Sequence, residues 1–247
     1  PVSWHNHVSG DHYTISEAWL DRVQEVLDYA VDDDMYVILN IHHDTDKEYC
    51  YPDKEHLEQS LSYMTFIWEQ LADRFGDYDE HVIFESINEP RLVETDHEWW
   101  LDMNAAECVE AVECINEWNQ NFVDVVRKTG GNNATRYLMV PGYDASADGV
   151  LNDKFVLPTD TAENEGKILV SVHAYIPYHF ALQAATENES IDQFNASEKT
   201  STNDIDQMME KLYAKYISNE IPVVIGEFGA RDKNGNLQSR VDYAAYY

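Results

Sequence analysis

The sequence predicts an α/β fold of the (β/α)8 TIM barrel type, and two observations lead to this prediction. Apolar, β-branched runs alternate with stretches whose apolar residues repeat at the helical period, which is typical of parallel strands joined by helices. Each apolar run then ends in polar or aromatic residues. A doubly wound sheet gathers its site at one switch point, whereas the carboxyl ends of all barrel strands converge on one mouth. Polar groups after every strand therefore favour a barrel.

The individual elements follow from the same patterns. Helical spacing of apolar residues predicts helices over about 17–31, 57–75, 107–128 and 205–216. Ser16 is the expected N-cap of the first helix and Gly76 the left-handed cap after the second. Residues 1–4 resemble the tail of a strand, and complete apolar strands are expected to begin near residues 35, 82, 136, 168 and 222. Segments 92–104 and 179–203 are predicted to be loops, the second without a core face.

Length and charge narrow the class of protein. At 247 residues we expect one domain over 1–247, because α/β barrels commonly reach this size undivided. Lys and Arg number 16 against 47 Asp and Glu, so the formal net charge is −31, which would repel nucleic acid and anionic lipid. No apolar run approaches the roughly 18 residues of a membrane helix. We therefore expect a monomer with neither nucleic-acid nor membrane partners, and the acidity fits either a salt-adapted or a secreted protein.

The run 82–91 ends abruptly in an amide, a carboxylate and a proline. Pro90 cannot donate to a sheet ladder and favours an extended backbone at Glu89. Asn88 and Glu89 are therefore expected at the carboxyl end of a buried strand, where parallel α/β folds build their sites. Glu227 follows the strand near 222 in the same way.

Two carboxylates on opposite walls of a cleft are the minimum equipment for glycoside hydrolysis. In a barrel, Glu89 and Glu227 would face each other across the mouth. Asn88 beside Glu89, and His173 and Tyr175 after the strand near 168, offer neutral groups suited to sugar hydroxyls. A buried Glu pair is also common in structural ion pairs, and His173 alone could be a core histidine. Trp99 and Trp100 could equally anchor their loop or stack against sugar rings.

Metal and cofactor sites are not expected. His42, His43 and Asp44 could form a metal cluster, but adjacent strand residues point to opposite faces, so one histidine should enter the mouth while the other lies behind it. The three cysteines match no zinc spacing, and Cys108 and Cys114 share a predicted helix at a separation too long for a disulfide. We read all three as thiols.

Four motifs together resemble glycoside hydrolase family five, the cellulase-like retaining endoglucanases, and specifically the bacterial subfamily active on cellulose, mixed-linkage glucan and often xyloglucan. In order along the chain they are Ile38-Leu39-Asn40-Ile41-His42-His43-Asp44, Phe84-Glu85-Ser86-Ile87-Asn88-Glu89-Pro90, His173-Ala174-Tyr175 and Ile225-Gly226-Glu227-Phe228-Gly229. The resemblance covers essentially the whole chain.

The resemblance implies a role for each motif residue. Glu89 would be the acid/base and Glu227 the nucleophile of a retaining endo-β-1,4-glucanase. Asn88 would bond the sugar 2-hydroxyl, and Tyr175 would partner Glu227. His42, His43 and His173 would line the subsite around the scissile bond. The family also implies a β-glucan substrate and, because polymeric glucan does not enter cells, secretion.

The sequence departs from the family pattern at both ends. An arginine that supports the nucleophile normally lies just before a segment like Pro1-Val2-Ser3-Trp4, and a tryptophan platform normally lies on strand eight. We therefore expect a partial barrel without its first strand, most of its second strand and its eighth strand. Two alternatives stay open: a related β-mannanase or xylanase, or a fragment that binds β-glucan without hydrolysing it.

Overall fold

The computed structural model describes residues 1–247 and divides them into two compact units. The N-terminal unit is Pro1–Ser171 and the C-terminal unit is Val172–Tyr247. None of the helices combines the length and the apolar character that a membrane crossing requires.

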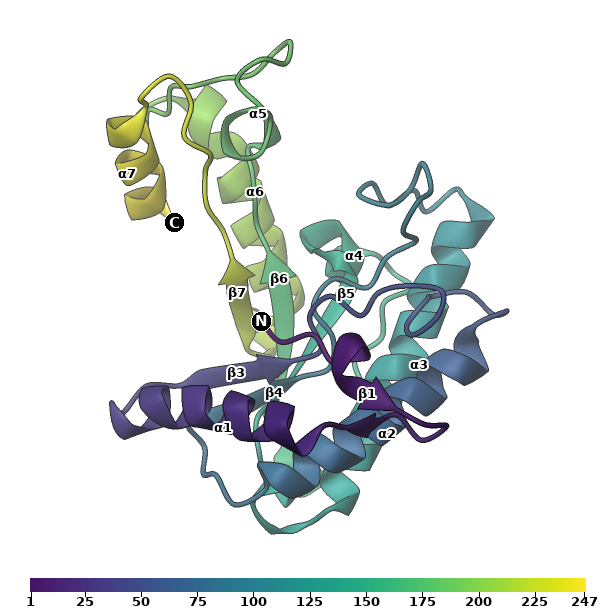
Figure 1. The fold of residues 1–247 in the computed structure, drawn as a ribbon. Helices are drawn as coiled ribbons and strands as arrows, with labels where there is room; N and C mark the ends of the chain where they lie inside the picture. The colour runs from purple at the N-terminus through teal and green to yellow at the C-terminus, as the bar shows by residue number, and fades with distance from the viewer. The chain divides into compact units, whose positions relative to one another are not determined.

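The N-terminal unit alternates strands and helices as the sequence predicts (Figure 1). Its elements are η1 (His5–His7), β1 (Val8–Ser9), β2 (Thr14–Ile15), α1 (Glu17–Asp32), β3 (Val37–Asn40), α2 (Leu57–Arg74), β4 (Val82–Glu85), α3 (Ala106–Lys128), η2 (Gly131–Ala134), β5 (Leu138–Ser146), α4 (Ala147–Leu151), η3 (Ala162–Asn164) and the start of β6 (Ile168–His173). Strands β1 and β2 form a short antiparallel hairpin. Residues 1–4 form no strand, although the Val2 carbonyl accepts a hydrogen bond from the His42 amide.

The main sheet of this unit is parallel, in the order β3-β4-β5-β6. The register pairs Val37 with Val82 and Asn40 with Glu85, so β3 and β4 end level with each other. Strand β5 joins β4 through the pair Glu85 and Met139. Because the strands run in the same direction, the residues that follow them emerge at one edge of the sheet, as predicted.

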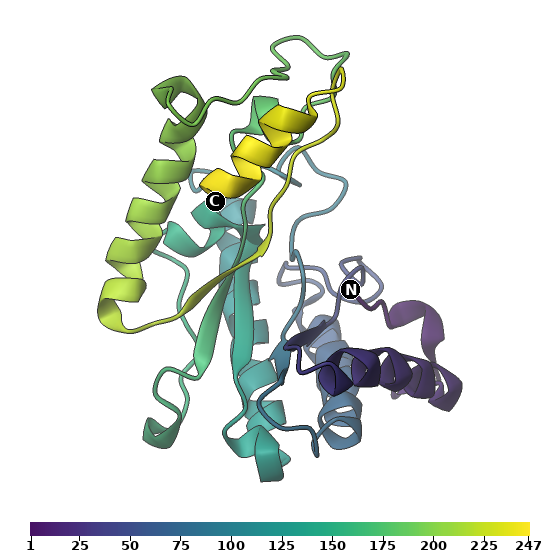
Figure 2. The same ribbon diagram turned by 90° about the vertical axis from the view of Figure 1, so that its left-hand side faces the viewer.

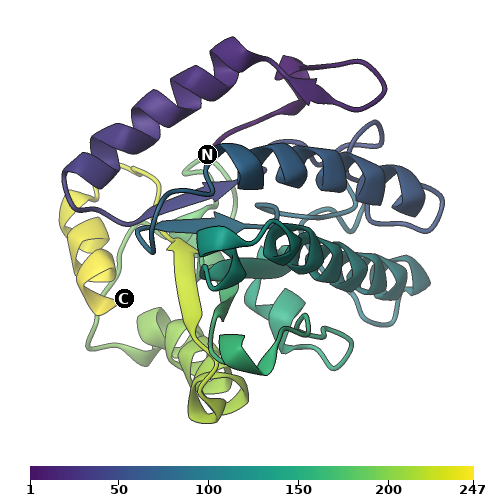
Figure 3. The same cartoon turned by 90° about the horizontal axis from the view of Figure 1, so that it is seen from below.

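Helices α2 and α3 lie side by side along the sheet (Figure 3). Their apolar faces meet at Trp68 of α2, whose ring centroid lies 4.6 Å from that of Phe122 on α3 and 5.3 Å from that of Phe84 on β4. All three side chains are fully buried. Cys50, Cys108 and Cys114 are buried free thiols, which confirms that prediction.

Two glycines are explained by close approach and not by a left-handed backbone. Gly76 does not adopt a positive φ, so its predicted role as a left-handed cap is wrong. A Cβ at this position would lie 2.7 Å from the Ala72 carbonyl oxygen, which only glycine avoids. Likewise a Cβ on Gly142 would lie 2.4 Å from the backbone of Gly149, where α4 turns back against β5.

The C-terminal unit contains the end of β6, α5 (Tyr178–Ala181), α6 (Lys199–Lys215), η4 (Ile217–Asn219), β7 (Val223–Glu227) and α7 (Leu237–Tyr246). Strand β7 follows β6 in the sheet, and α6 leads through η4 into β7 (Figure 2). Just beyond β6, the Ala174 amide donates to the Glu227 carbonyl at 2.8 Å. This bond holds the ends of β6 and β7 together.

The predicted loop 179–203 is partly wrong. Helix α6 already begins at Lys199, and α5 covers the start of the segment. Phe180 and Phe194 are buried in one cluster with Ile205 and Tyr243. The ring centroids of the two phenylalanines lie 5.5 Å apart. The two phenylalanines are too far apart in sequence to show a helical or strand period, so periodicity could not reveal them as core residues.

A buried arginine closes the other end of the N-terminal sheet. Arg136 is 3% exposed and stacks its guanidinium on Phe84, 4.6 Å from the ring centroid. Its nitrogens donate to the Asn133 side chain and to five backbone carbonyls, those of Phe75, Gly76, Tyr78, Asp79 and Val82. Burial lowers the pKa of Arg136 to about 10, so the group stays charged at neutral pH. One side chain, Arg136, therefore supplies hydrogen bonds to several carbonyls of the turn between α2 and β4.

We predict that Arg136→Met lowers the free energy of unfolding by about 3 kcal/mol, because several buried acceptors lose their donor together. Urea titration of the protein, followed by tryptophan fluorescence, measures the change. Arg22→Met is the matched control, since Arg22 pairs only with Glu25 at the surface. Equal midpoints for Arg136→Met and the parent protein would contradict the assignment.

Candidate active site

Asn88 and Glu89 lie beyond the last assigned residue of β4, but backbone hydrogen bonds continue past the strand. The Ser86 amide donates to the Met139 carbonyl at 3.0 Å, and the Asn88 amide donates to the Ile41 carbonyl at 2.8 Å. Asn88 is 3% exposed, and the Glu89 side chain is 18% exposed. The two residues thus stand at the carboxyl edge of the sheet, as the sequence predicts.

A buried polar layer lies beneath these residues. Asn40 Nδ2 lies 2.9 Å from Glu85 Oε2, 3.1 Å from His42 Nδ1 and 3.5 Å from Asn88 Oδ1. The other oxygen of Glu85 accepts a 2.6 Å hydrogen bond from Ser171. Each of β3, β4 and β6 contributes one of these polar side chains, in the middle of an apolar run. The layer orients Asn88 and His42 from below.

His42 and His43 follow Asn40, the last residue of β3, and their surroundings differ. Their ring centroids lie 4.4 Å apart in an edge-to-face contact. His42 Nδ1 lies 3.1 Å from Asn40 Nδ2, whereas His43 is exposed.

Asp44 is a structural centre of the loop after β3. It is fully buried, and its carboxylate accepts from the Trp4 amide at 3.1 and 3.0 Å and from the Tyr63 hydroxyl at 2.9 Å. His5 Nδ1 lies 2.6 Å from Oδ1. Burial, followed by the Asp44 charge, raises the pKa of Tyr63 far above its usual range, so Tyr63 remains a donor. Asp44 therefore connects the loop after β3 to the N-terminal segment, at Trp4 and His5, and to Tyr63 of α2.

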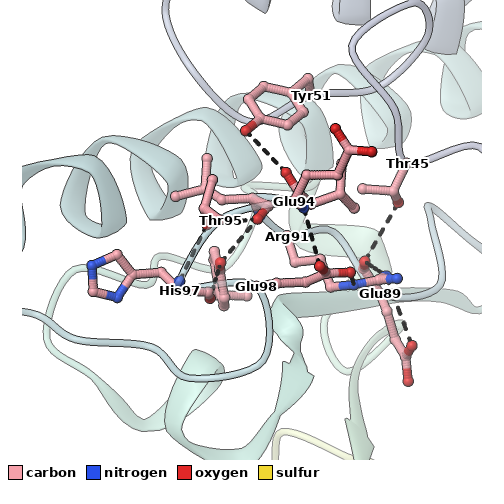
Figure 4. Close-up of polar contacts among 11 residues, drawn as sticks. Thr45, Tyr51, Glu89, Arg91, Glu94, Thr95, His97 and Glu98 are labelled. Atoms are coloured by element: carbon pink, nitrogen blue, oxygen red, sulfur yellow. Dashed lines mark hydrogen bonds and ion pairs between the residues drawn. The ribbon is translucent and has the colours of Figure 1, made fainter.

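The segment after Glu89 is held by Tyr143 of β5. Tyr143 is fully buried on β5. Its hydroxyl donates to the His97 carbonyl at 2.6 Å and accepts from the Leu92 amide at 3.1 Å. Arg91, in the same segment, donates to the Glu89 carbonyl at 2.9 Å (Figure 4).

In the C-terminal unit, Glu227 is the last residue of β7. The Tyr175 hydroxyl donates to Glu227 Oε2 at 2.6 Å, and His173 Nδ1 lies 3.8 Å from the same oxygen. The Glu227 side chain is 32% exposed, whereas His173 is 8% exposed. The structure thus places two of the predicted site residues, His173 and Tyr175, around the carboxylate of a third, Glu227.

Trp99 and Trp100 are 51% and 63% exposed. The guanidinium carbon of Arg91 lies 4.0 Å from the Trp99 ring centroid, so Trp99 contacts its own loop near Glu89. Stacking of these rings against sugars stays a prediction.

One group in the N-terminal unit has ligand atoms close enough to share a metal ion, namely Asp53, Glu55 and His56. His56 Nδ1 already lies 2.7 Å from Asp53 Oδ1, and the His56 amide donates to the same oxygen at 2.8 Å. The arrangement is a hydrogen-bonded turn before α2.

Several residues that support the site escaped the sequence analysis. A usable signal existed for Asn40, Glu85 and Ser171, because each is polar within an otherwise apolar strand. Tyr143 and Arg91 offered no such signal, since the backbone groups that they bond, the His97 carbonyl and the Glu89 carbonyl among them, are not identified by any sequence pattern.

The chain matches the profile of the cellulases, described as glycosyl hydrolase family 5, over residues 1–247. The chain belongs to glycosyl hydrolase family 5. This family 5 chain is 42% identical to Endoglucanase B of Ruminococcus albus over 241 residues, which is 98% of this chain and 54% of that protein. It is 41% identical to Endoglucanase B of the organism Neocallimastix patriciarum, covering 100% of this chain and 48% of that protein.

Solved structures of family 5 show the same fold. A family 5 lichenase from Caldicellulosiruptor sp. F32 is 59% identical with a TM-score of 0.98, over 100% of this chain and 66% of that one. XEG5A, a xyloglucan-specific endo-β-1,4-glucanase from a metagenomic library solved with cellotriose, is 36% identical with a TM-score of 0.87, over 100% of this chain and 68% of that one. The predicted fold class, a partial (β/α)8 barrel, is confirmed. The chain spans about half the length of the curated relatives that it matches.

We predict that Tyr63→Phe lowers the free energy of unfolding by about 2 kcal/mol, because a buried carboxylate loses one charge-assisted donor. Thermal and urea unfolding measure the loss. Tyr29→Phe is the control, since the Tyr29 hydroxyl donates to Glu25 on the surface. A midpoint for Tyr63→Phe as high as that of Tyr29→Phe would show that Asp44 does not need this donor.

Proposed function

We propose that the protein is an endo-acting β-1,4-glucanase that hydrolyses cellulose-like or mixed-linkage β-glucan by a retaining double displacement. The observation that carries this proposal is the Tyr175–Glu227 hydrogen bond at the end of β7 in a chain of family 5. Glycoside hydrolysis requires two carboxyl groups. Here one is Glu227, which the Tyr175 hydroxyl orients, and the other is Glu89, which follows a different barrel strand.

In the proposed reaction, Glu227 attacks the anomeric carbon while protonated Glu89 donates its proton to the leaving oxygen. The glycosidic C–O bond breaks as the bond from Glu227 to the sugar forms. Glu89 then removes a proton from the water that releases the sugar from Glu227. Tyr175 donates to Oε2 of Glu227, so Oε1 is the oxygen proposed to attack.

Asn88 is suited to bond the sugar 2-hydroxyl. Its Oδ1 faces Asn40 Nδ2, so its own Nδ2 is the end that points away from the polar layer and can donate to a hydroxyl. Hydrogen bonds to the 2-hydroxyl that strengthen in the transition state supply part of the catalysis in such enzymes. His42, His43 and His173 would complete the wall of this subsite.

The substrate class rests on the relatives. Solved relatives include a lichenase with bound cellotetraose, a xyloglucan-specific endoglucanase and a broad-specificity endoglucanase with cellotriose. These ligands and activities support a β-1,4-linked glucan chain as the partner of this protein. We further propose that it works outside the cell as a monomer, because polymeric glucan does not enter cells and one chain supplies all the proposed groups.

We predict that Glu227→Gln abolishes hydrolysis while oligosaccharide binding persists, because the amide cannot form the glycosyl-enzyme bond. Reducing-sugar release from carboxymethylcellulose and calorimetry with cellotetraose measure the two effects in the full-length protein, with Glu210→Gln on the exposed face of α6 as control.

NMR of the hydrolysis of a β-glucan should show the β-anomer of the product first. An inverted product, or a crystal structure with the two carboxyl groups ~9 Å apart instead of about 5 to 5.5 Å, would contradict a retaining mechanism.

A substrate panel separates the proposed glucanase from a β-mannanase, a xylanase or a binding protein. We expect kcat/KM on mixed-linkage β-glucan or xyloglucan to exceed that on mannan and xylan by at least about tenfold. A preference for mannan or xylan would reassign the substrate. Binding without any release of reducing sugar would reassign the protein as a carbohydrate-binding module.

A further inference from the structure

Arg91 lies directly beside the proposed acid/base, Glu89, and also contacts Glu98. Nη1 donates to the Glu89 carbonyl at 2.9 Å and lies 3.9 Å from Glu89 Oε2, while Nε lies 3.3 Å from Glu98 Oε1 (Figure 4). The Arg91 side chain is 17% exposed and the Glu89 side chain 18%. One nitrogen thus contacts both the backbone and the carboxylate of Glu89, which restricts the backbone and the side-chain torsions of that residue together.

The arginine is itself held on two further sides. The Trp99 ring covers the flat face of the guanidinium, with 4.0 Å between the guanidinium carbon and the ring centroid. Glu98 balances the charge, and its second oxygen accepts from the Glu94 amide at 3.0 Å. Glu94 has a φ of +63°, a conformation that a non-glycine residue adopts only when its surroundings impose it.

The loop that carries these groups is anchored to the sheet. Tyr143 of β5 holds both the Leu92 amide and the His97 carbonyl, and the Asp144 amide donates to the Pro90 carbonyl at 2.8 Å. On the other side, Thr45 Oγ1 lies 3.4 Å from the Glu89 carbonyl oxygen that Arg91 also contacts. Arg91 therefore lies in an anchored loop and can hold Glu89 in a fixed position.

We propose that Arg91 is a positioning residue for the acid/base, holding the Glu89 carboxyl group where it can protonate the leaving sugar oxygen. The inference rests on the proposed function. Glu98 keeps the guanidinium in place and balanced in charge, and Trp99 shields it from water. Proton transfer is sensitive to placement, because the acid must lie within hydrogen-bond reach of the oxygen that it protonates.

The test compares two substrates of the full-length protein that differ in their need for a proton. The leaving sugar of cellotetraose must be protonated, whereas 2,4-dinitrophenol leaves as a stable anion. For Arg91→Met we expect kcat/KM on cellotetraose to fall about tenfold to a hundredfold, and kcat/KM on dinitrophenyl β-cellobioside to change less than about threefold. Azide, which needs no base, should raise kcat of the variant on the aryl substrate and leave that of the parent protein unchanged.

Arg127→Met is the matched control. Arg127 also pairs with one carboxylate, that of Asp160, and donates to one backbone carbonyl, that of Asn133, but it lies near the end of α3. We expect this variant to lose stability without changing the ratio of the two kcat/KM values. Arg91→Lys keeps the charge but not the forked geometry, so its ratio should fall between those of the parent protein and Arg91→Met.

Each outcome decides the proposal. An equal loss on both substrates for Arg91→Met, or no loss on either, would overturn the positioning role while leaving the glucanase intact. A changed ratio in Arg127→Met would show that any destabilisation produces the effect, and would also overturn it. If the parent protein hydrolyses neither substrate, the proposed function itself fails.

Discussion

The buried carboxylate of Asp44 is the constraint on which the N-terminal unit depends. It accepts hydrogen bonds from the chain before α1, through the Trp4 amide, and from α2, through Tyr63. A buried charge is tolerated only when such donors surround it, and the donors in turn cannot be lost singly without cost. The next residue, Thr45, reaches the carbonyl of Glu89. The packing of the loop after β3 therefore also fixes the position of the Glu89 backbone.

Polar groups in this protein form two levels with different tasks. The lower level, formed by Asn40, Glu85 and Ser171, is buried and mutually hydrogen-bonded, so its geometry is rigid. The upper level contains Asn88 and Glu89, which the lower level and the Arg91 loop hold from two sides. The same division recurs in the C-terminal unit, where the more exposed Glu227 is held by the hydroxyl of Tyr175. Rigid support beneath a partly exposed carboxylate is what precise proton or bond transfer requires.

The sequence predicted most of the fold because strands and helices here carry strong apolar patterns. The strand near 82 and the helix over 107–128 match β4 and α3 closely. Predictions failed where contacts between residues in the folded chain could not be read from their spacing in the sequence. Phe180 meets Phe194 only through the folded chain. Gly76 is required by the Ala72 carbonyl, which the sequence cannot show as a neighbour.

The sequence by itself determined the fold class, the strand ends and, through four motifs in register, the family and the candidate residues Glu89 and Glu227. This was possible because catalytic groups follow apolar strands at fixed positions in the chain. Only the tertiary structure decided which residues hold them. Tyr143 and Asn40 contact segments that are distant in sequence, and Arg91 acts from a loop that Tyr143 anchors. Such contacts depend on distances that arise only when the strands are placed side by side.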